Sequence, residues 1–147
     1  PFLASFALLM TARDGGEWWT LGTMIIIASV DTWAFATGLL VGKHPMAPKI
    51  SPKKTWEGFA GSVVFALAAG IILANTMLQI DWWWGAVFAL VLVGTATTGD
   101  LIESLIKREL GTKDASDLLP GHGGFLDRLD SVLPSMLVAS VFAIFFS

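Results

Sequence analysis

The sequence contains no cysteine and no tyrosine, and charged residues make up only 14% of its 147 residues. The absence of cysteine excludes disulfide bonds, thiolate metal sites and cysteine nucleophiles. Soluble domains carry roughly 25% charged residues, so the few charges here are too sparse to coat a soluble surface. With 54% hydrophobic residues, the chain is also too apolar to be disordered. These shortages together indicate a membrane protein.

The chain also lacks a basic patch on the scale that nucleic-acid binding needs. Its net charge is −3, so we expect no nucleic-acid partner. It opens at Pro1 in an apolar run, with neither an initiator Met nor a basic segment, and we do not interpret this start as a signal peptide. We expect residues 1–147 to form a single membrane domain, the C-terminal part of a longer polytopic protein whose N-terminal spans are missing here.

Uncharged stretches of about 20 residues predict membrane spans, because a helix of that length crosses the ~30 Å hydrocarbon core. Only one of the stretches found here contains a charge, Asp31. Tryptophans lie near the expected boundaries, as in interfacial aromatic belts. The predicted fold is an all-α, polytopic membrane helix bundle of about five spans, the first truncated. The spans are 1–12, 18–42, 58–80, 82–99 and 131–147.

The basic residues are confined to alternate connections. Eight of the nine lie in residues 43–57 and 107–130. Alternate loops face the same side of a membrane, and the positive-inside rule makes that side cytoplasmic. We therefore expect two basic cytoplasmic loops on a multi-pass protein of the cell (inner) membrane. Three prolines make the first loop extended rather than helical, and residues 101–110 have helical spacing that extends the fourth span.

Four acidic residues near the predicted span ends are candidates for chemistry. Asp100 and Glu103 share a helix face at the spacing i, i+3, and Asp127 and Asp130 repeat that spacing before the last span. Two such pairs brought together would make an all-oxygen site that suits Mg²⁺. The alternative is that all four are solvated charges at helix ends.

Asp31 is the only charge inside a predicted span. A carboxylate there costs a few kcal/mol or more and usually serves a function. We expect it to belong to the same cavity as the basic loops and to be one of the catalytic residues. The alternative is a structural hydrogen bond to a neighbouring helix.

The two basic loops also contain candidate phosphate ligands. Three glycines surround His122, and bare backbone N–H groups in such a turn can bind phosphate. The alternatives are an ordinary flexible turn and lysines that only anchor the topology. His44 and His122 are lone histidines, and neither has metal-ligand spacing. The candidate substrate ligands are Ser51, Lys53, Lys54, Lys107, Arg108, Lys113, His122, Gly123, Gly124 and Arg128.

Residues 104–130, SLIKRELGTKDASDLLPGHGGFLDRLD, hold many polar side chains at fixed spacing. This segment resembles the signature of the phosphatidate cytidylyltransferases, also called CDP-diglyceride synthases. Residues 43–58 and 99–104 resemble other segments of the same family. The similarity covers nearly the whole chain from about Val30 onward and matches the C-terminal half of the family's proteins.

The resemblance implies a membrane nucleotidyltransferase of phospholipid synthesis. Its reaction would join CTP and phosphatidic acid to give CDP-diacylglycerol and pyrophosphate, and it would require Mg²⁺. Asp100 and Asp127 would be the ligands of a two-cation centre in which K⁺ is the candidate second cation. The other partners expected are the lipid bilayer and the missing N-terminal spans, and a homodimer is left open.

Two other classes of protein are compatible with some of these residues. An ion channel or transporter would place Asp31 and the span-end carboxylates along an ion path, although it leaves the Gly-rich loop and the basic clusters unexplained. An inactive assembly fragment would bind CTP at most, without turnover. Within the enzyme class, a related lipid phosphate could be the acceptor.

Overall fold

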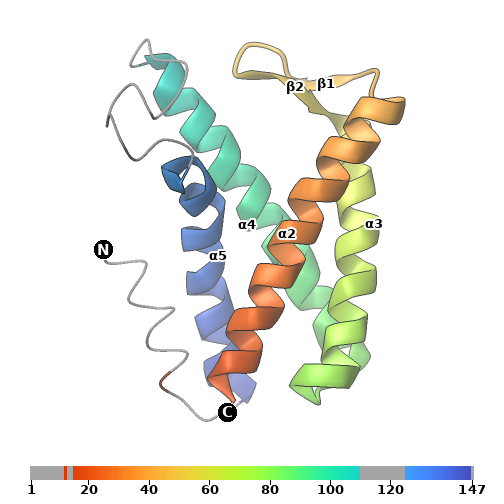
Figure 1. Ribbon diagram of the computed structural model, residues 1–147, viewed down its shortest axis with the longest axis vertical. Helices are drawn as coiled ribbons and strands as arrows, with labels where there is room; N and C mark the ends of the chain where they lie inside the picture. The colour runs from red at the N-terminus through yellow and green to blue at the C-terminus, as the bar shows by residue number, and fades with distance from the viewer. Residues whose placement is uncertain (1–11, 13–14, 110–124, 147) are drawn as a thin grey trace.

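The computed structural model describes residues 12, 15–109 and 125–146, and the side chains at 107, 125–131 and 133 lie outside that description. The chain is mostly helical, as expected. A two-stranded hairpin, which the sequence did not predict, lies across one end of the helices (Figure 1). The elements are α2 (Gly16–Val41), β1 (Pro45–Ala47), β2 (Ser51–Thr55), α3 (Trp56–Leu73), the π-helical turn η1 (Ala74–Leu78), α4 (Trp82–Glu109) and α5 (Phe125–Phe146).

Three helices are long and apolar enough to cross a membrane, over Gly16–Val41, Trp56–Leu78 and Trp82–Ile106. They match the second, third and fourth predicted spans, and α4 runs on past the predicted end of its span to Glu109, as expected. The apolar part of α5, Pro134–Phe146, is shorter than a full span. The first predicted span lies almost entirely outside the described residues, so the count of five spans stays a prediction.

The outward faces of the bundle are apolar. Leu40 of α2 is 80% exposed, Ile72 of α3 is 61% exposed and Phe145 of α5 is 70% exposed. Large apolar surfaces of this kind mark contact with lipid or with another protein. Together with the three long apolar helices, they indicate a membrane protein.

Glycines allow the helices to approach closely at two crossings. A Cβ added at Gly58 of α3 would lie 2.7 Å from the carbonyl oxygen of Ala34 in α2. A Cβ added at Gly70 of α3 would lie 2.5 Å from the carbonyl oxygen of Gly85 in α4. Small residues at helix contacts let backbones come together in membrane bundles. The two crossings therefore set how closely α3 packs against α2 near the hairpin and against α4 near the opposite end of the bundle.

The apolar core fills the end of the bundle away from the hairpin. Trp19, near the start of α2, packs edge to face on Phe88 of α4, with ring centroids 5.3 Å apart, and stacks on Phe146 of α5 at 5.8 Å. Ile26 and Leu92 are fully buried. Figure 1 shows the start of α2 and the end of α5 opposite the hairpin. This arrangement leaves the hairpin end of the bundle for polar groups.

The hairpin connects α2 to α3 and is extended, as its prolines predict. β1 and β2 pair antiparallel, with Pro45 opposite Thr55 and Ala47 opposite Ser51. Because a two-stranded sheet has only edge strands, Pro52 is tolerated although it has no N–H to donate. Thr55 ends the hairpin and caps α3, since its hydroxyl accepts a hydrogen bond of 3.1 Å from the backbone N–H of Gly58.

Candidate active site

A cavity of about 360 Å³ lies at the hairpin end, bounded by the hairpin and by α2, α3 and α4. Its walls are mixed in chemistry. Phe35, Met46 and Phe59 supply apolar surface. The charged and hydroxyl side chains that line it include Asp31, Ser51, Lys53, Lys54, Thr97 and Asp100. Pockets that are largely apolar with a few convergent polar groups are the usual sites for small-molecule ligands.

Lys54 and Asp100 form an ion pair inside this cavity. Nζ of Lys54 donates a hydrogen bond of 2.7 Å to Oδ2 of Asp100. The two side chains are 27% and 32% exposed. An ion pair with this much access to solvent adds about 0–1 kcal/mol to stability. The ion pair therefore matters for geometry, because it holds the ammonium group of Lys54 against the carboxylate of Asp100 on α4.

Asp31 lines the same cavity from α2. Its residue is exposed, so the carboxylate is not enclosed among packed helices. The hairpin folds back after α2 ends, and Lys53 and Lys54 thereby lie on the cavity that Asp31 also lines. Two carboxylates and two lysines from three separate elements thus share one cavity.

The oxygen atoms of this cavity are of the type that binds hard divalent cations. Asp31 and Asp100 offer carboxylates, and Ser51 and Thr97 offer hydroxyl groups. Within the described parts of the chain, no three acidic or histidine side chains lie close enough together to hold a metal ion. Asp100 thus offers the kind of ligand that a hard cation binds, and its pairing with Asp127 in a metal site stays a prediction.

Other predicted residues lie near the cavity without lining it. Glu103, one turn beyond Asp100 in α4, is half-buried and has a buried Oε1 atom. Arg108, near the end of α4, donates from Nε to the carbonyl oxygen of Ile50 at 2.5 Å. Arg108 therefore contacts the turn between β1 and β2, a contact that the sequence did not predict.

Several predicted residues lie where the structure gives no side-chain detail. Lys113, His122, Gly123 and Gly124 lie outside the described residues. The side chains of Lys107, Asp127, Arg128 and Asp130 are likewise outside the description, although their backbone is helical. α5 begins at Phe125, before the predicted span start at residue 131, so Asp127 and Asp130 fall within its first two turns. α5 packs against α4, the helix that carries Asp100.

His44 and Glu57 form a pair that sequence reasoning missed. Nδ1 of His44 lies 2.6 Å from Oε1 of Glu57, and the backbone N–H of His44 donates to Oε2 at 3.2 Å. The sequence did hold a partial signal, because Thr55 followed by Glu57 is typical of a helix start with an acidic first turn. Nothing in the spacing indicates that His44 would be the partner.

Comparisons with known proteins point to one family. A family model described as the cytidylyltransferase family matches residues 1–146. The chain is 49% identical over 139 residues to the phosphatidate cytidylyltransferase of Mycobacterium leprae, a match that covers 95% of this chain and 45% of that protein. The enzyme of the same name from Mycobacterium tuberculosis is 47% identical over 139 residues, covering 95% and 42%. That of Brucella abortus is 36% identical over 151 residues, covering 99% and 56%. The chain thus spans about half the length of the curated relatives it matches.

Proposed function

The chain belongs to the cytidylyltransferase family, and we therefore propose that the protein containing it transfers the cytidylyl group of CTP to phosphatidic acid. The products are CDP-diacylglycerol and pyrophosphate. The observation that carries this proposal is the cavity that Lys53, Lys54, Asp31 and Asp100 line together. Such a mixture of cations and carboxylates suits a polyphosphate bound together with a metal ion.

The reaction needs positioning and charge stabilisation more than acid–base chemistry. A phosphate oxygen of the lipid attacks the α-phosphorus of CTP, and the bond from that phosphorus to the oxygen shared with the β-phosphate breaks. Pyrophosphate leaves on the side opposite the attacking oxygen and takes the electron pair of that bond with it. The attacking phosphate is already an anion, so no strong base is required. Lys53 and Lys54 neutralise phosphate charge, and the basic residues of the segment 107–130 supplement them, namely Lys107, Lys113 and Arg128.

The ammonium group of Lys54 suits this task because it has three donors. One of them is used by Asp100, and we propose that the other two bind phosphate oxygens. Ser51 lines the same cavity and adds a hydroxyl donor from the hairpin. We further propose that His122, Gly123 and Gly124 complete the phosphate site from the Gly-rich turn.

We propose Asp100 and Asp127 as the protein ligands of Mg²⁺, with K⁺ as the candidate second cation. The carboxylate of Asp100 on the cavity wall supports this assignment. Bound there, a divalent cation would offset the negative charge that builds up on the triphosphate. Glu103 and Asp130 are proposed to orient these ligands rather than to bind the metal.

We propose that the hairpin end faces the cytoplasm in a multi-pass inner-membrane protein. The basic residues of the hairpin and the end of α4 support this side. A lipid with two acyl chains reaches such a cavity from the bilayer, and a water-soluble nucleotide reaches it from the cytoplasm. We further propose that the whole protein has additional N-terminal spans and forms a homodimer. The family assignment gives no support to a channel or transporter.

The proposal is tested by measuring pyrophosphate release from CTP by the full-length protein in detergent or lipid. Release is expected only when both phosphatidic acid and Mg²⁺ are present. An inactive assembly fragment would bind CTP without releasing pyrophosphate. Release that does not depend on phosphatidic acid would contradict the proposed acceptor, and a preference for another lipid phosphate would redefine it.

A further inference from the structure

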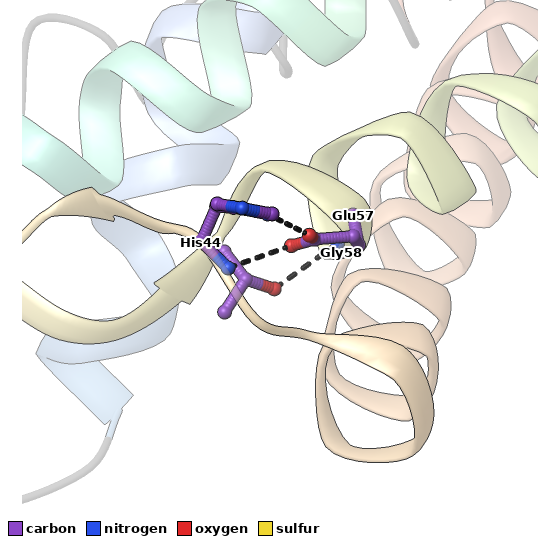
Figure 2. Close-up of polar contacts among 4 residues, drawn as sticks. His44, Glu57 and Gly58 are labelled. Carbon is purple, nitrogen blue, oxygen red and sulfur yellow. Dashed lines mark hydrogen bonds and ion pairs between the residues drawn. The ribbon is translucent and has the colours of Figure 1, made fainter.

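The hairpin β1–β2 is attached to the helices at its base. Figure 2 shows the side chains of His44 and Glu57 facing each other where the hairpin meets α3, next to Gly58, whose backbone N–H donates to the cap residue Thr55. Glu57 accepts from the backbone N–H of His44, and the backbone N–H of Trp56 donates to the carbonyl oxygen of His44 at 3.0 Å. These bonds hold His44, just before β1, against Trp56 and Glu57 in the first turn of α3.

The hairpin is also attached at its turn, to a different helix. The contact comes from Arg108, whose Nε donates to the carbonyl oxygen of Ile50. Arg108 lies on α4 two turns beyond Asp100, so the turn of the hairpin and the body of the hairpin contact the same helix. A two-stranded hairpin is marginally stable by itself. Its position over the cavity therefore depends on such outside contacts.

Lys54 lies between these two attachments, at the point where the hairpin contacts Asp100. We propose that His44, Glu57 and Arg108 are positioning residues, which hold the hairpin over the cavity so that Lys54 stays against Asp100. The inference deepens the proposed function and rests on it for the effect on catalysis. The inference gives Arg108 a positioning task, which it performs through the hydrogen bond from its Nε to Ile50.

Amide hydrogen exchange of the full-length protein tests the placement of the hairpin without reference to activity. Glu57→Ala and Arg108→Ala are each expected to speed exchange within residues 44–56 by about tenfold, because each removes a contact made by a charged group. Glu17→Ala is the matched control, since Glu17 occupies the first turn of α2 as Glu57 occupies that of α3. Unchanged exchange in both test variants would overturn the inference.

A double-mutant cycle tests whether the positioning acts through Lys54. Glu57→Ala and Arg108→Ala are each expected to lower kcat/KM by about tenfold. Neither is expected to lower it further in a Lys54→Ala background, because the residue that they position is already missing. An additive loss for Arg108→Ala would show direct phosphate binding and overturn its positioning role. If the unaltered protein released no pyrophosphate from CTP, the proposed function would fail, and hydrogen exchange alone would still decide the inference.

Discussion

Nζ of Lys54 lies 2.7 Å from Oδ2 of Asp100, although the two residues are 46 positions apart in the sequence. The contact joins the hairpin to α4 and places a proposed phosphate ligand beside a proposed metal ligand. The two side chains carry opposite charges, so they attract each other at this distance. Substituting either residue is therefore expected to affect both halves of the proposed site.

Asp100→Asn keeps the size of the side chain and removes its charge. Pyrophosphate release is expected to fall by more than the roughly 10–100-fold loss typical of groups that only orient metal ligands. Asp127→Asn is expected to behave alike. Asp81→Asn, at the opposite end of α4, is the control for the charge change. Near-normal turnover by Asp100→Asn with an unchanged melting temperature would remove Asp100 from the metal site.

Lys54→Ala removes a cation from the cavity and leaves Asp100 without this partner. The KM for CTP is expected to rise by about tenfold, as for the loss of one hydrogen bond to a charged group. A loss of kcat as well would show that the contact strengthens in the transition state. Lys49→Ala is the matched control, because Lys49 is an exposed lysine of the same hairpin that does not line the cavity. Equal effects of the two substitutions on the KM would show that CTP responds to the overall charge of the hairpin and not to a specific contact with Lys54.

Asp31→Ala is expected to impair turnover more than folding. Asp31 is an exposed residue that lines the cavity, so shortening its side chain removes few packing contacts. Activity and thermal melting of the same preparation separate the two effects, and Thr32→Ala serves as a control at the neighbouring exposed position. A melting temperature that falls in proportion to activity would instead assign Asp31 to the fold.

Gly58→Ala is expected to destabilise the bundle by about 1–3 kcal/mol, the usual range for overpacking. The added methyl group would meet the carbonyl oxygen of Ala34 at the crossing of α2 and α3. Gly94→Ala is the matched control, because no described atom outside the adjacent backbone of α4 lies within 4 Å of a Cβ built there. It is expected to be neutral, or stabilising by up to about 1 kcal/mol through helix propensity. The free energies of unfolding in detergent check both expectations.

Single cysteines test the proposed orientation, since the 147 residues contain none of their own. Cysteines at Lys49 and Glu109 are expected to react with a membrane-impermeant reagent from the cytoplasmic side, because the Arg108–Ile50 contact places the two regions together. A cysteine at Asp81 is expected to react only from the other side. Reaction of positions 49 and 109 from opposite sides would contradict the topology and the shared site together.

The sequence alone determined where the long helices lie. Long apolar stretches with at most one charge predicted the helices that became α2, α3 and α4, because a chain that crosses lipid must satisfy its backbone hydrogen bonds internally. Helical spacing beyond residue 99 likewise predicted that α4 continues. The sequence did not predict the hairpin, because Ile50 and Thr55 are the only β-branched residues between His44 and Thr55, and prolines interrupt the segment.

Only the tertiary structure decided which polar groups meet. The sequence predicted Lys54, Asp100 and Asp31 as site residues, but spacing along the chain does not indicate which residues of different elements will be in contact. Their meeting depends on how closely the helices cross, and Gly58 and Gly70 set that approach through backbone contacts. The contacts of Arg108 with Ile50 and of Glu57 with His44 follow from the same geometry. Periodicity records which face of a helix is apolar, whereas the partner of a polar side chain is fixed only when the helices have packed.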